Sequence, residues 1–395
     1  MSWKIPLSDL NFGAEEEAAV LRVLRSGWLS QGPETEAFEQ EFADYLGVKH
    51  AIAVANGTAA LHLALLGIGI DSGDAVIQPA VNFVSAANMT VAVGALPVFA
   101  DICSLDEPTI SPQSAQQAIE ACLAAGGPKP KAVVVMHYGG YPCRMRDLEA
   151  LCKAQDLWLI EDACHGVGAS VAMSDKGVVK LGAVGDVGCF SFFANKNLVT
   201  GEGGMVTTNS DELARKIRLL RSHGMTTLTW QRHQGHAATY DVVEHGLNYR
   251  FDEIRAAIGR LQLGRLDENN ARRRELSAAY FERLTPLQDD GWIFPFQIQQ
   301  KSQQECMASA HLFTAVAPDT ATRWKCTDAL KEQGIQTSLH YPLVPKFDAF
   351  SNFALNDEVG VSRQFCERTI TLPLYPSMVK NQVTAVTRAL IEATG

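Results

Sequence analysis

The segment that decides the fold is Ala51-Ile52-Ala53-Val54-Ala55-Asn56-Gly57-Thr58-Ala59-Ala60-Leu61. It begins as an apolar run of strand length, breaks at a glycine, and continues as an apolar helix pattern. The free N–H groups and the dipole of such a helix start favour a phosphate group, and the Thr58 hydroxyl adds a further donor. The same pattern also fits a simple capped helix, so this segment alone leaves both interpretations open.

Short apolar runs alternate with helical patterns along the first half of the chain. Helical spacing occurs at residues 14–25, 58–66 and 211–221, the last with Ser210 as its N-cap. Further apolar runs of strand length lie at residues 97–100, 132–136, 157–160, 187–193 and 205–208. Alternation of this kind predicts βαβ units and a mostly parallel sheet with helices on both faces.

The pattern changes in the second half of the chain. Residues 222–246 are polar and aperiodic, residues 252–284 predict a long helix or a helix pair, and residues 286–310 are irregular. The elements expected after them are a strand at 311–317, a helix at 320–333 and a strand at 337–340. This pattern indicates a smaller α+β domain.

Composition narrows the class of protein. The chain has 395 residues, of which 47% are hydrophobic and 20% are charged, and its formal net charge is −10. These values are ordinary for globular proteins and exclude collagen-like, disordered and disulfide-scaffold chains. The negative charge disfavours nucleic acid and anionic membranes as partners.

Local features indicate a cytoplasmic protein. The N-terminus has no apolar core of a secretory signal, and the uncharged residues 75–100 contain amides and prolines that are costly in a membrane. Nine scattered cysteines without a C-x-x-C pair indicate reduced thiols. His233 and His236 stand in a polar stretch without nearby carboxylates, which is more typical of a plain loop than of a metal site. We therefore expect no metal.

Two polar residues follow apolar strands in the middle of the chain. Asp162 comes just after the run at 157–160, at the strand end where open α/β sheets bind ligands. A buried carboxylate there needs a partner, and a protonated ring nitrogen of a cofactor would be one. Alternatively, Asp162 only caps the next helix. Lys196 follows an aromatic strand and precedes a glycine-rich turn. A lysine held there is partly desolvated with a lowered pKa, as a Schiff-base amine requires, whereas most lysines are solvated surface groups.

Together these segments form a phosphate cradle, an acidic ring partner and a lysine, in that order along the chain. Pyridoxal 5′-phosphate (PLP) needs this set, because the lysine binds its aldehyde and the carboxylate keeps the pyridine nitrogen protonated. Phe83, after another apolar run, is suited to stacking on the ring; packing in the core is the alternative for a lone aromatic side chain.

Eight motifs extend this set almost from end to end of the chain. They are Leu29-Ser30-Gln31-Gly32-Pro33, Asn56-Gly57-Thr58-Ala59-Ala60-Leu61, Glu161-Asp162-Ala163, Phe190-Ser191-Phe192-Phe193-Ala194-Asn195-Lys196-Asn197, Gly201-Glu202-Gly203-Gly204, Asn248-Tyr249-Arg250, His340-Tyr341-Pro342 and Leu372-Pro373-Leu374-Tyr375-Pro376. In these motifs the chain resembles the DegT/DnrJ/EryC1/StrS aminotransferases, which mostly act on nucleotide-linked keto sugars.

The resemblance implies an α/β fold, the aspartate aminotransferase-like fold type I of PLP-dependent transferases. Its large domain, with a mostly parallel sheet of the seven-stranded type, would span residues 1–250. A linking helix and a small α+β C-terminal domain would span residues 251–395. Such enzymes are homodimers whose active sites lie at the subunit interface.

The resemblance also implies a role for each matching residue. Lys196 would carry PLP as a Schiff base, Asp162 would pair with the ring nitrogen, and His165 would lie near the phenolic oxygen. Phe83 would stack on the ring. The residues expected at the phosphate are Gly57, Thr58 and Ser191, with Asn248 reaching the phosphate of the neighbouring subunit, and those expected on the substrate side are His340 and Tyr341.

We therefore expect a PLP-dependent aminotransferase that aminates a nucleotide-linked keto sugar. The resemblance implies an amino acid as the amino donor, namely glutamate. Two half-reactions at one site predict ping-pong kinetics. The family's sugar dehydratases replace the lysine with histidine, so Lys196 indicates transamination. The alternatives are a transaminase of a non-nucleotide ketone such as an inosose, and a non-catalytic PLP-binding regulator. Residues 226–243 are individual to this chain and suggest either substrate selectivity or subunit contacts.

Overall fold

Seven strands form the central sheet in the order β1-β9-β8-β5-β4-β2-β3. The computed structural model describes residues 3–124, 126–227, 230, 233, 235, 239–301, 306–351, 353 and 359–395. The strands of this sheet are β1 (His50–Val54), β2 (Asp74–Pro79), β3 (Leu96–Ala100), β4 (Lys129–Met136), β5 (Trp158–Asp162), β8 (Val187–Ser191) and β9 (Gly204–Thr208). All neighbouring pairs are parallel except those of β9, which runs antiparallel to both β1 and β8. The expected mostly parallel sheet is confirmed.

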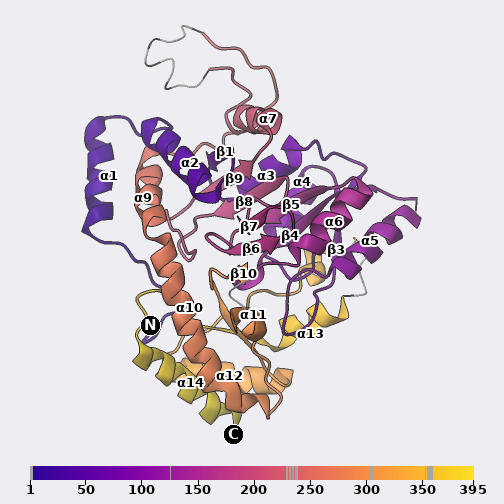
Figure 1. Cartoon of the computed structure of the whole chain (residues 1–395), viewed down its shortest axis with the longest axis vertical. Coiled ribbons are helices and arrows are strands. Elements are labelled where there is room, and N and C mark those ends of the chain that lie inside the picture. The colour runs from indigo at the N-terminus through magenta and orange to yellow at the C-terminus, as the bar shows by residue number, and fades with distance from the viewer. Residues whose placement is uncertain are drawn as a thin grey trace.

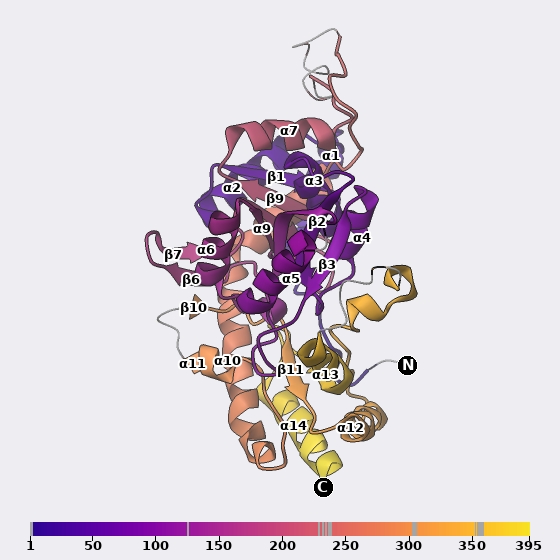
Figure 2. The same ribbon diagram turned by 90° about the vertical axis from the view of Figure 1, so that its right-hand side faces the viewer.

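Helices cover both faces of this sheet, as Figures 1 and 2 show. Those of the first two thirds of the chain are α1 (Ala14–Ser26), α2 (Pro33–Leu46), α3 (Gly57–Gly67), α4 (Ser85–Ala92), α5 (Pro112–Ala124), α6 (Met145–Gln155), α7 (Asp211–Arg221) and α9 (Glu253–Gly264). Alternate residues of β4 show why both faces are apolar: Val134 packs in the cluster with α3 and α7, whereas Val133 and Val135 pack with α5 and α6. A strand buried on both sides needs such a continuous apolar run.

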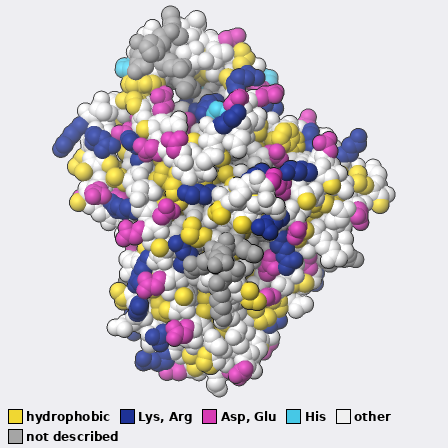
Figure 3. Space-filling model, viewed as in Figure 1, with side chains coloured by type: hydrophobic (Ala, Val, Ile, Leu, Met, Phe, Trp, Pro, Cys, Tyr) yellow, Lys and Arg dark blue, Asp and Glu magenta, His cyan; other side chains and the backbone are white. Residues whose placement is uncertain are grey.

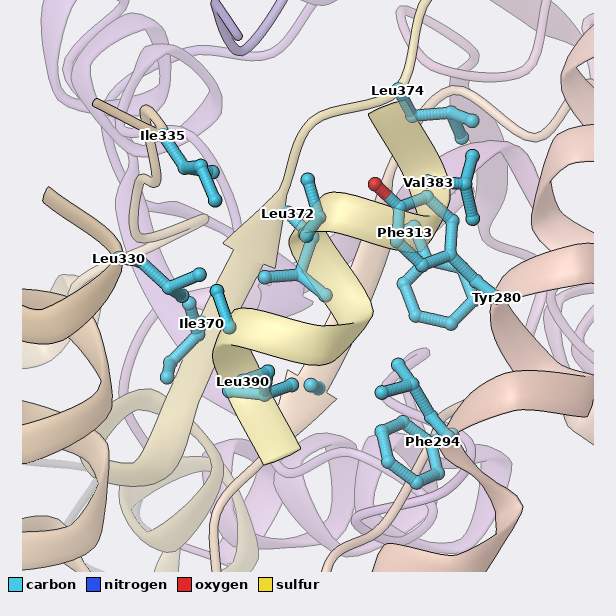
Figure 4. Packing of buried hydrophobic residues seen from close by; sticks show 14 of the residues in the cluster. Tyr280, Phe294, Phe313, Leu330, Ile335, Ile370, Leu372, Leu374, Val383 and Leu390 are labelled. Carbon is cyan, nitrogen blue, oxygen red and sulfur yellow. The ribbon is translucent and has the colours of Figure 1, made fainter. Parts of the chain in front are cut away.

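The C-terminal third builds a second core around β11 (Phe313–Val316) and β12 (Thr369–Leu372), which pair antiparallel. Its helices are α10 (Leu266–Leu284), α11 (Gln297–Lys301), α12 (Thr320–Glu332), α13 (Gly360–Arg368) and α14 (Lys380–Thr394). Figure 4 shows Tyr280 of α10, Phe313 of β11 and Leu390 of α14 in one apolar cluster. The expected helix pair at 252–284 is confirmed as α9 and α10, and the division of the chain at residue 250 stays a prediction.

Two expectations for this region need correction. Residues 337–340 do not form a strand: Ser338 makes a single bridge to Thr371, because the next residues turn away to line a cavity. The irregular stretch 286–310 contains α11 and the short strand β10 (Cys306–Met307) in its described part. Strand β10 joins a hairpin, β6 (Ser170–Met173) and β7 (Gly177–Lys180), that the apolar periodicity did not indicate.

Short one-turn helices complete the fold, at Tyr138–Gly140, Thr285–Gln288, Val344–Lys346 and Asp348–Phe350. Beyond α7, residues 222–227 and 239–248 run side by side through bridges at Met225–Val242 and Ser222–Asn248. Gln234, His236 and part of the loop 226–243 lie outside the described residues.

The surface and the thiols agree with the composition. Lysine and arginine side chains are interspersed with acidic ones over the face shown in Figure 3. In the part of the chain that the structure describes, no helix has both the length and the apolar character of a membrane span. None of the nine cysteines, all of which lie in the described part of the chain, forms a disulfide, and most are buried, as expected for reduced thiols.

Candidate active site

A cavity of about 510 Å³ opens at the carboxyl ends of the parallel strands. One wall comes from the start of α3, the ends of β5 and β8, and the turn after β8; the opposite wall is formed by residues 338–341. The predicted site residues that line it are Gly57, Thr58, Phe83, Asp162, His165, Ser191, Lys196, His340 and Tyr341. Segments up to nearly 300 residues apart in sequence thus meet at one site, as the strand-end argument requires.

The start of α3 forms one corner of this cavity. The Asn56 side chain caps the helix by accepting a hydrogen bond from Ala59 N–H at 2.8 Å. A Cβ atom on Gly57 would lie 2.8 Å from the Cβ of Ser191, closer than such atoms approach. Glycine is therefore required for the helix start to reach the end of β8. The corner presents backbone N–H groups with the hydroxyls of Thr58 and Ser191, which is donor chemistry suited to a phosphate.

Asp162 is the last residue of β5 and is only 3% exposed. Its Oδ1 accepts a hydrogen bond from Cys164 N–H at 3.2 Å, and its backbone carbonyl accepts one from His137 N–H. The residue also lines the cavity. A buried carboxylate needs a partner, and a protonated ring nitrogen is one.

Glu161, one residue before, points to the other side of the strand and holds it in place. Its fully buried carboxylate accepts hydrogen bonds from the N–H groups of Gly182, Val184 and Gly185 at 2.7–2.9 Å and lies 2.9 Å from His137 Nε2. This anchor fixes the end of β5 and thus the position of Asp162. The sequence signal was a carboxylate inside an apolar run, but it did not identify the partners.

Lys196 lies in the turn after β8, where its backbone N–H donates to Phe193 O at 2.9 Å. Burial lowers the pKa of this amine, and the nearby Cys164 and Asp162 oppose that shift only in part. The predicted lowering of the lysine pKa is thereby confirmed. A lysine with a lowered pKa has a larger fraction of neutral, nucleophilic amine at neutral pH.

Three buried histidines surround Lys196, and burial lowers the pKa of each: His165, His311 and His340. The charge of Lys196 adds to the shift, and the pKa of His340 falls to about 4. These rings are therefore neutral at neutral pH. His311 was not among the predicted site residues.

Because the His165 ring is neutral, it carries one proton, and its partners show which nitrogen holds it. Gly139 N–H donates to its Nδ1 at 3.3 Å, so the ring proton is on Nε2. That Nε2–H lies 2.8 Å from the Tyr341 hydroxyl oxygen and donates to it. The Tyr341 hydroxyl therefore keeps its own proton to donate elsewhere.

Two predicted residues stand apart from the buried set. Phe83 is 52% exposed although it is large and apolar, and its ring centre is 5.7 Å from that of Tyr341 inside the cavity. This exposure to the cavity favours the stacking interpretation over core packing. Asn248 is exposed and lies outside the cavity lining of its own chain.

The fold and this set of groups define the class: an aminotransferase, with a desolvated lysine and a buried carboxylate at the strand ends of an α/β sheet. The chain belongs to the DegT/DnrJ/EryC1/StrS aminotransferase family, whose sequence model matches residues 11–391. This family acts on sugars and depends on PLP.

Individual relatives resemble nearly the whole chain. The spore coat polysaccharide biosynthesis protein SpsC of Bacillus subtilis (strain 168) is 38% identical over 394 residues, covering 98% of this chain and 96% of the relative. The crystal structure of the aminotransferase TlmJ from Streptoalloteichus hindustanus superposes with a TM-score of 0.87 at 31% identity, covering 100% and 99% of the two chains. The structure of DesV from S. venezuelae gives a TM-score of 0.87 at 32% identity with the same coverage. The predicted fold and family are confirmed.

Proposed function

We propose that this protein uses PLP to transfer an amino group from an amino acid, glutamate, to a keto sugar carried on a nucleotide. The observation that carries the proposal is the placement of the desolvated Lys196 amine, the Asp162 carboxylate and the α3 start around one cavity. Those three features match the aldehyde, the ring nitrogen and the phosphate of the cofactor.

The residues present fit the cofactor. Gly57 lacks the Cβ that would fill the space against Ser191, which leaves a donor-rich corner for a phosphate. Lys196 would bind the cofactor covalently, and Thr58 and Ser191 would donate to its phosphate. Asp162 would accept a hydrogen bond from the protonated ring nitrogen, Phe83 would stack on the ring, and His165 would lie near its phenolic oxygen.

When bound, the cofactor supplies a ring that accepts the electron pair released at the α-carbon of the amino donor. The Lys196 Nζ would act as general base and acid, taking the proton from the α-carbon of the donor and delivering it to the cofactor. The negative charge of Asp162 would keep the ring nitrogen protonated. The Tyr341 hydroxyl accepts the hydrogen bond from His165 Nε2–H, so its own proton would be available to an oxygen of a bound ligand.

A nucleotide-linked substrate is supported by the name of the relative SpsC, which places that protein in polysaccharide biosynthesis. The phosphates of such a substrate need cations or N–H donors. Among the described residues that line the cavity, Lys196 is the only lysine or arginine, and Asp162 and Glu202 are acidic. The remaining positive charge would therefore come from outside this cavity lining.

We propose that a second copy of the chain supplies the positive charge that the substrate phosphates need. Several large apolar side chains near α1 are exposed, as an interface requires: Leu10, Phe12, Leu21, Leu24 and Leu29. Asn248, exposed on its own chain, would reach the phosphate site of the partner subunit. The chain would then act as a homodimer of two-domain subunits divided near residue 250. The absence of disulfides among its nine described cysteines supports a cytoplasmic location.

Two absorbance titrations test the proposed function. The PLP-loaded protein should change its absorption spectrum on addition of glutamate and release 2-oxoglutarate in equal amount. A uridine- or thymidine-diphosphate keto sugar should then restore the first spectrum, with ping-pong kinetics. Turnover of an inosose with no response to any nucleotide sugar would contradict the substrate class, and no response to any amino acid would contradict the activity. Light scattering would test the dimer.

A further inference from the structure

His311 lies behind Lys196 and is joined to the same turn. It is 3% exposed, and its backbone is fixed by a hydrogen bond from its N–H to Gly139 O at 2.8 Å and by Arg273, whose guanidinium donates to the carbonyl of His311. Its Nδ1 lies 2.9 Å from Oδ1 of Asn197, the residue directly after Lys196. The ring therefore sits at a defined place beside the catalytic lysine.

The proton on this ring can be placed from its partners. Asn197 Nδ2 donates to the Ser309 carbonyl at 2.9 Å and to Asn270 Oδ1 at 2.7 Å. A carbonyl only accepts, so the amide nitrogen faces Ser309 and the amide oxygen faces His311. His311 must then carry its proton on Nδ1. Because burial keeps the ring neutral, Nε2 is a bare acceptor, and it has no hydrogen-bond partner among the described residues.

A second orphaned acceptor lies on the other side of Lys196. The Oδ1 atom of Asn195 is buried and also lacks a partner within the described part of the chain. Asn195 and His311 both line a separate cavity of about 20 Å³, together with Ser8, His340 and Thr371. Asn195 and His340 also line the main cavity, so they form the wall between the two spaces. Buried acceptors without donors are costly, about 1–3 kcal/mol each.

We propose that one water molecule occupies this small cavity and donates its two protons to His311 Nε2 and Asn195 Oδ1. A cavity of this size holds a single water, which needs two to four polar partners, and the Ser8 hydroxyl supplies a third. His311 then holds both neighbours of Lys196, Asn197 directly and Asn195 through the water. His311 is thus a positioning residue for the lysine. This role rests on the proposed function, whereas the presence of the water does not depend on it.

A crystal structure that resolves ordered water, determined with and without PLP, tests the site first. We expect density within hydrogen-bond distance, about 2.7–3.2 Å, of both Asn195 Oδ1 and His311 Nε2. Absence of density, or a His311 ring turned so that Nε2 meets Asn197, would overturn the assignment. This outcome does not depend on any activity.

The positioning role is tested with two variants. His311→Asn keeps a donor for Asn197 Oδ1 but loses the acceptor in the small cavity, and His311→Leu loses both. We expect kcat to be highest in the wild type, lower in His311→Asn and lowest in His311→Leu. The difference between the two variants should be on the order of 10-fold. KM should stay nearly constant, and the pH at which the absorption spectrum of bound PLP changes should shift.

A lower melting temperature with unchanged kcat and unchanged spectral pH profile would reduce His311 to a structural residue and overturn the role. His50→Gln, at a histidine that contacts Asp211 outside both cavities, is the matched control and should match wild type. Failure of the wild-type protein to respond to PLP would contradict the proposed function, while the crystallographic result would still decide the water site.

Discussion

The two walls of the active-site cavity are built in different ways. On the sheet side, Gly57, Asp162 and Ser191 are placed by strand and helix ends close to them in sequence. On the C-terminal side, His340 and Tyr341 are placed by contacts with distant residues such as Thr371 and His165. The sheet wall supplies charged groups and hydrogen-bond donors suited to a phosphate, whereas the C-terminal wall supplies neutral rings. The comparison indicates that cofactor chemistry resides in local motifs and that the substrate side depends on the tertiary fold.

The largest expected effect is on the sheet wall, at Lys196. Lys196→Ala should lower turnover by about 1,000-fold or more, because both the covalent attachment and the moving proton are lost. Steady-state release of 2-oxoglutarate measures this. Full turnover in the variant would show that the lysine has no chemical role.

Asp162→Asn should lower kcat by on the order of 100-fold. The amide keeps an oxygen for the Cys164 N–H but removes the charge that holds a ring nitrogen protonated. The same change at the exposed Asp211 is the control and should have little effect. Equal kcat for wild type and Asp162→Asn would contradict the assignment of this carboxylate.

A smaller effect is expected at the phosphate corner. The Cβ of Gly57→Ala would press on Ser191, and overpacking of this kind costs about 1–3 kcal/mol. PLP affinity should fall by roughly 5- to 150-fold, as measured by fluorescence titration. Gly264→Ala, where a Cβ meets open space, is the matched control. Equal PLP affinity in the Gly57 variant would place the phosphate elsewhere.

On the C-terminal wall, the neutral His340 should make the stability of the folded chain depend on pH. The pKa of His340 is about 4 in the folded chain, below its ordinary value of 6.5. From pH 6.5 to 5 the unfolded chain binds a proton there that the folded chain does not, so the folded state loses about 2 kcal/mol. Above pH 7 the contribution of this histidine to the pH dependence is small and fades as the unfolded chain loses its proton.

His340→Gln should therefore have a melting temperature that falls less steeply between pH 7 and 5 than that of wild type, measured without cofactor. Parallel curves for the two proteins would contradict a neutral His340 in the folded state. This prediction tests the C-terminal wall, with burial as the main cause of the His340 shift and the charge of Lys196 as the second.

The same contrast explains how much could be predicted from the sequence. The apolar run at 157–160 ends two residues before Asp162, and the run at 187–193 contains Ser191, so the strands followed from local pattern to within about two residues. The roles of these two residues came from the family resemblance and stay predictions. The expected strand at 337–340 was wrong because those residues pair at one bridge and then turn into the cavity. His311 was missed because its partner Asn197 is 114 residues away. No periodicity reports a contact of that separation.

The most direct test of the central claim is to find where PLP is attached. Borohydride reduction of the loaded protein converts the link between the cofactor and its amine into a stable bond, and peptide mass spectrometry then locates it. We expect one modified residue, Lys196, and no modification when glutamate is added before reduction. Modification at another lysine, or none at Lys196, would contradict it.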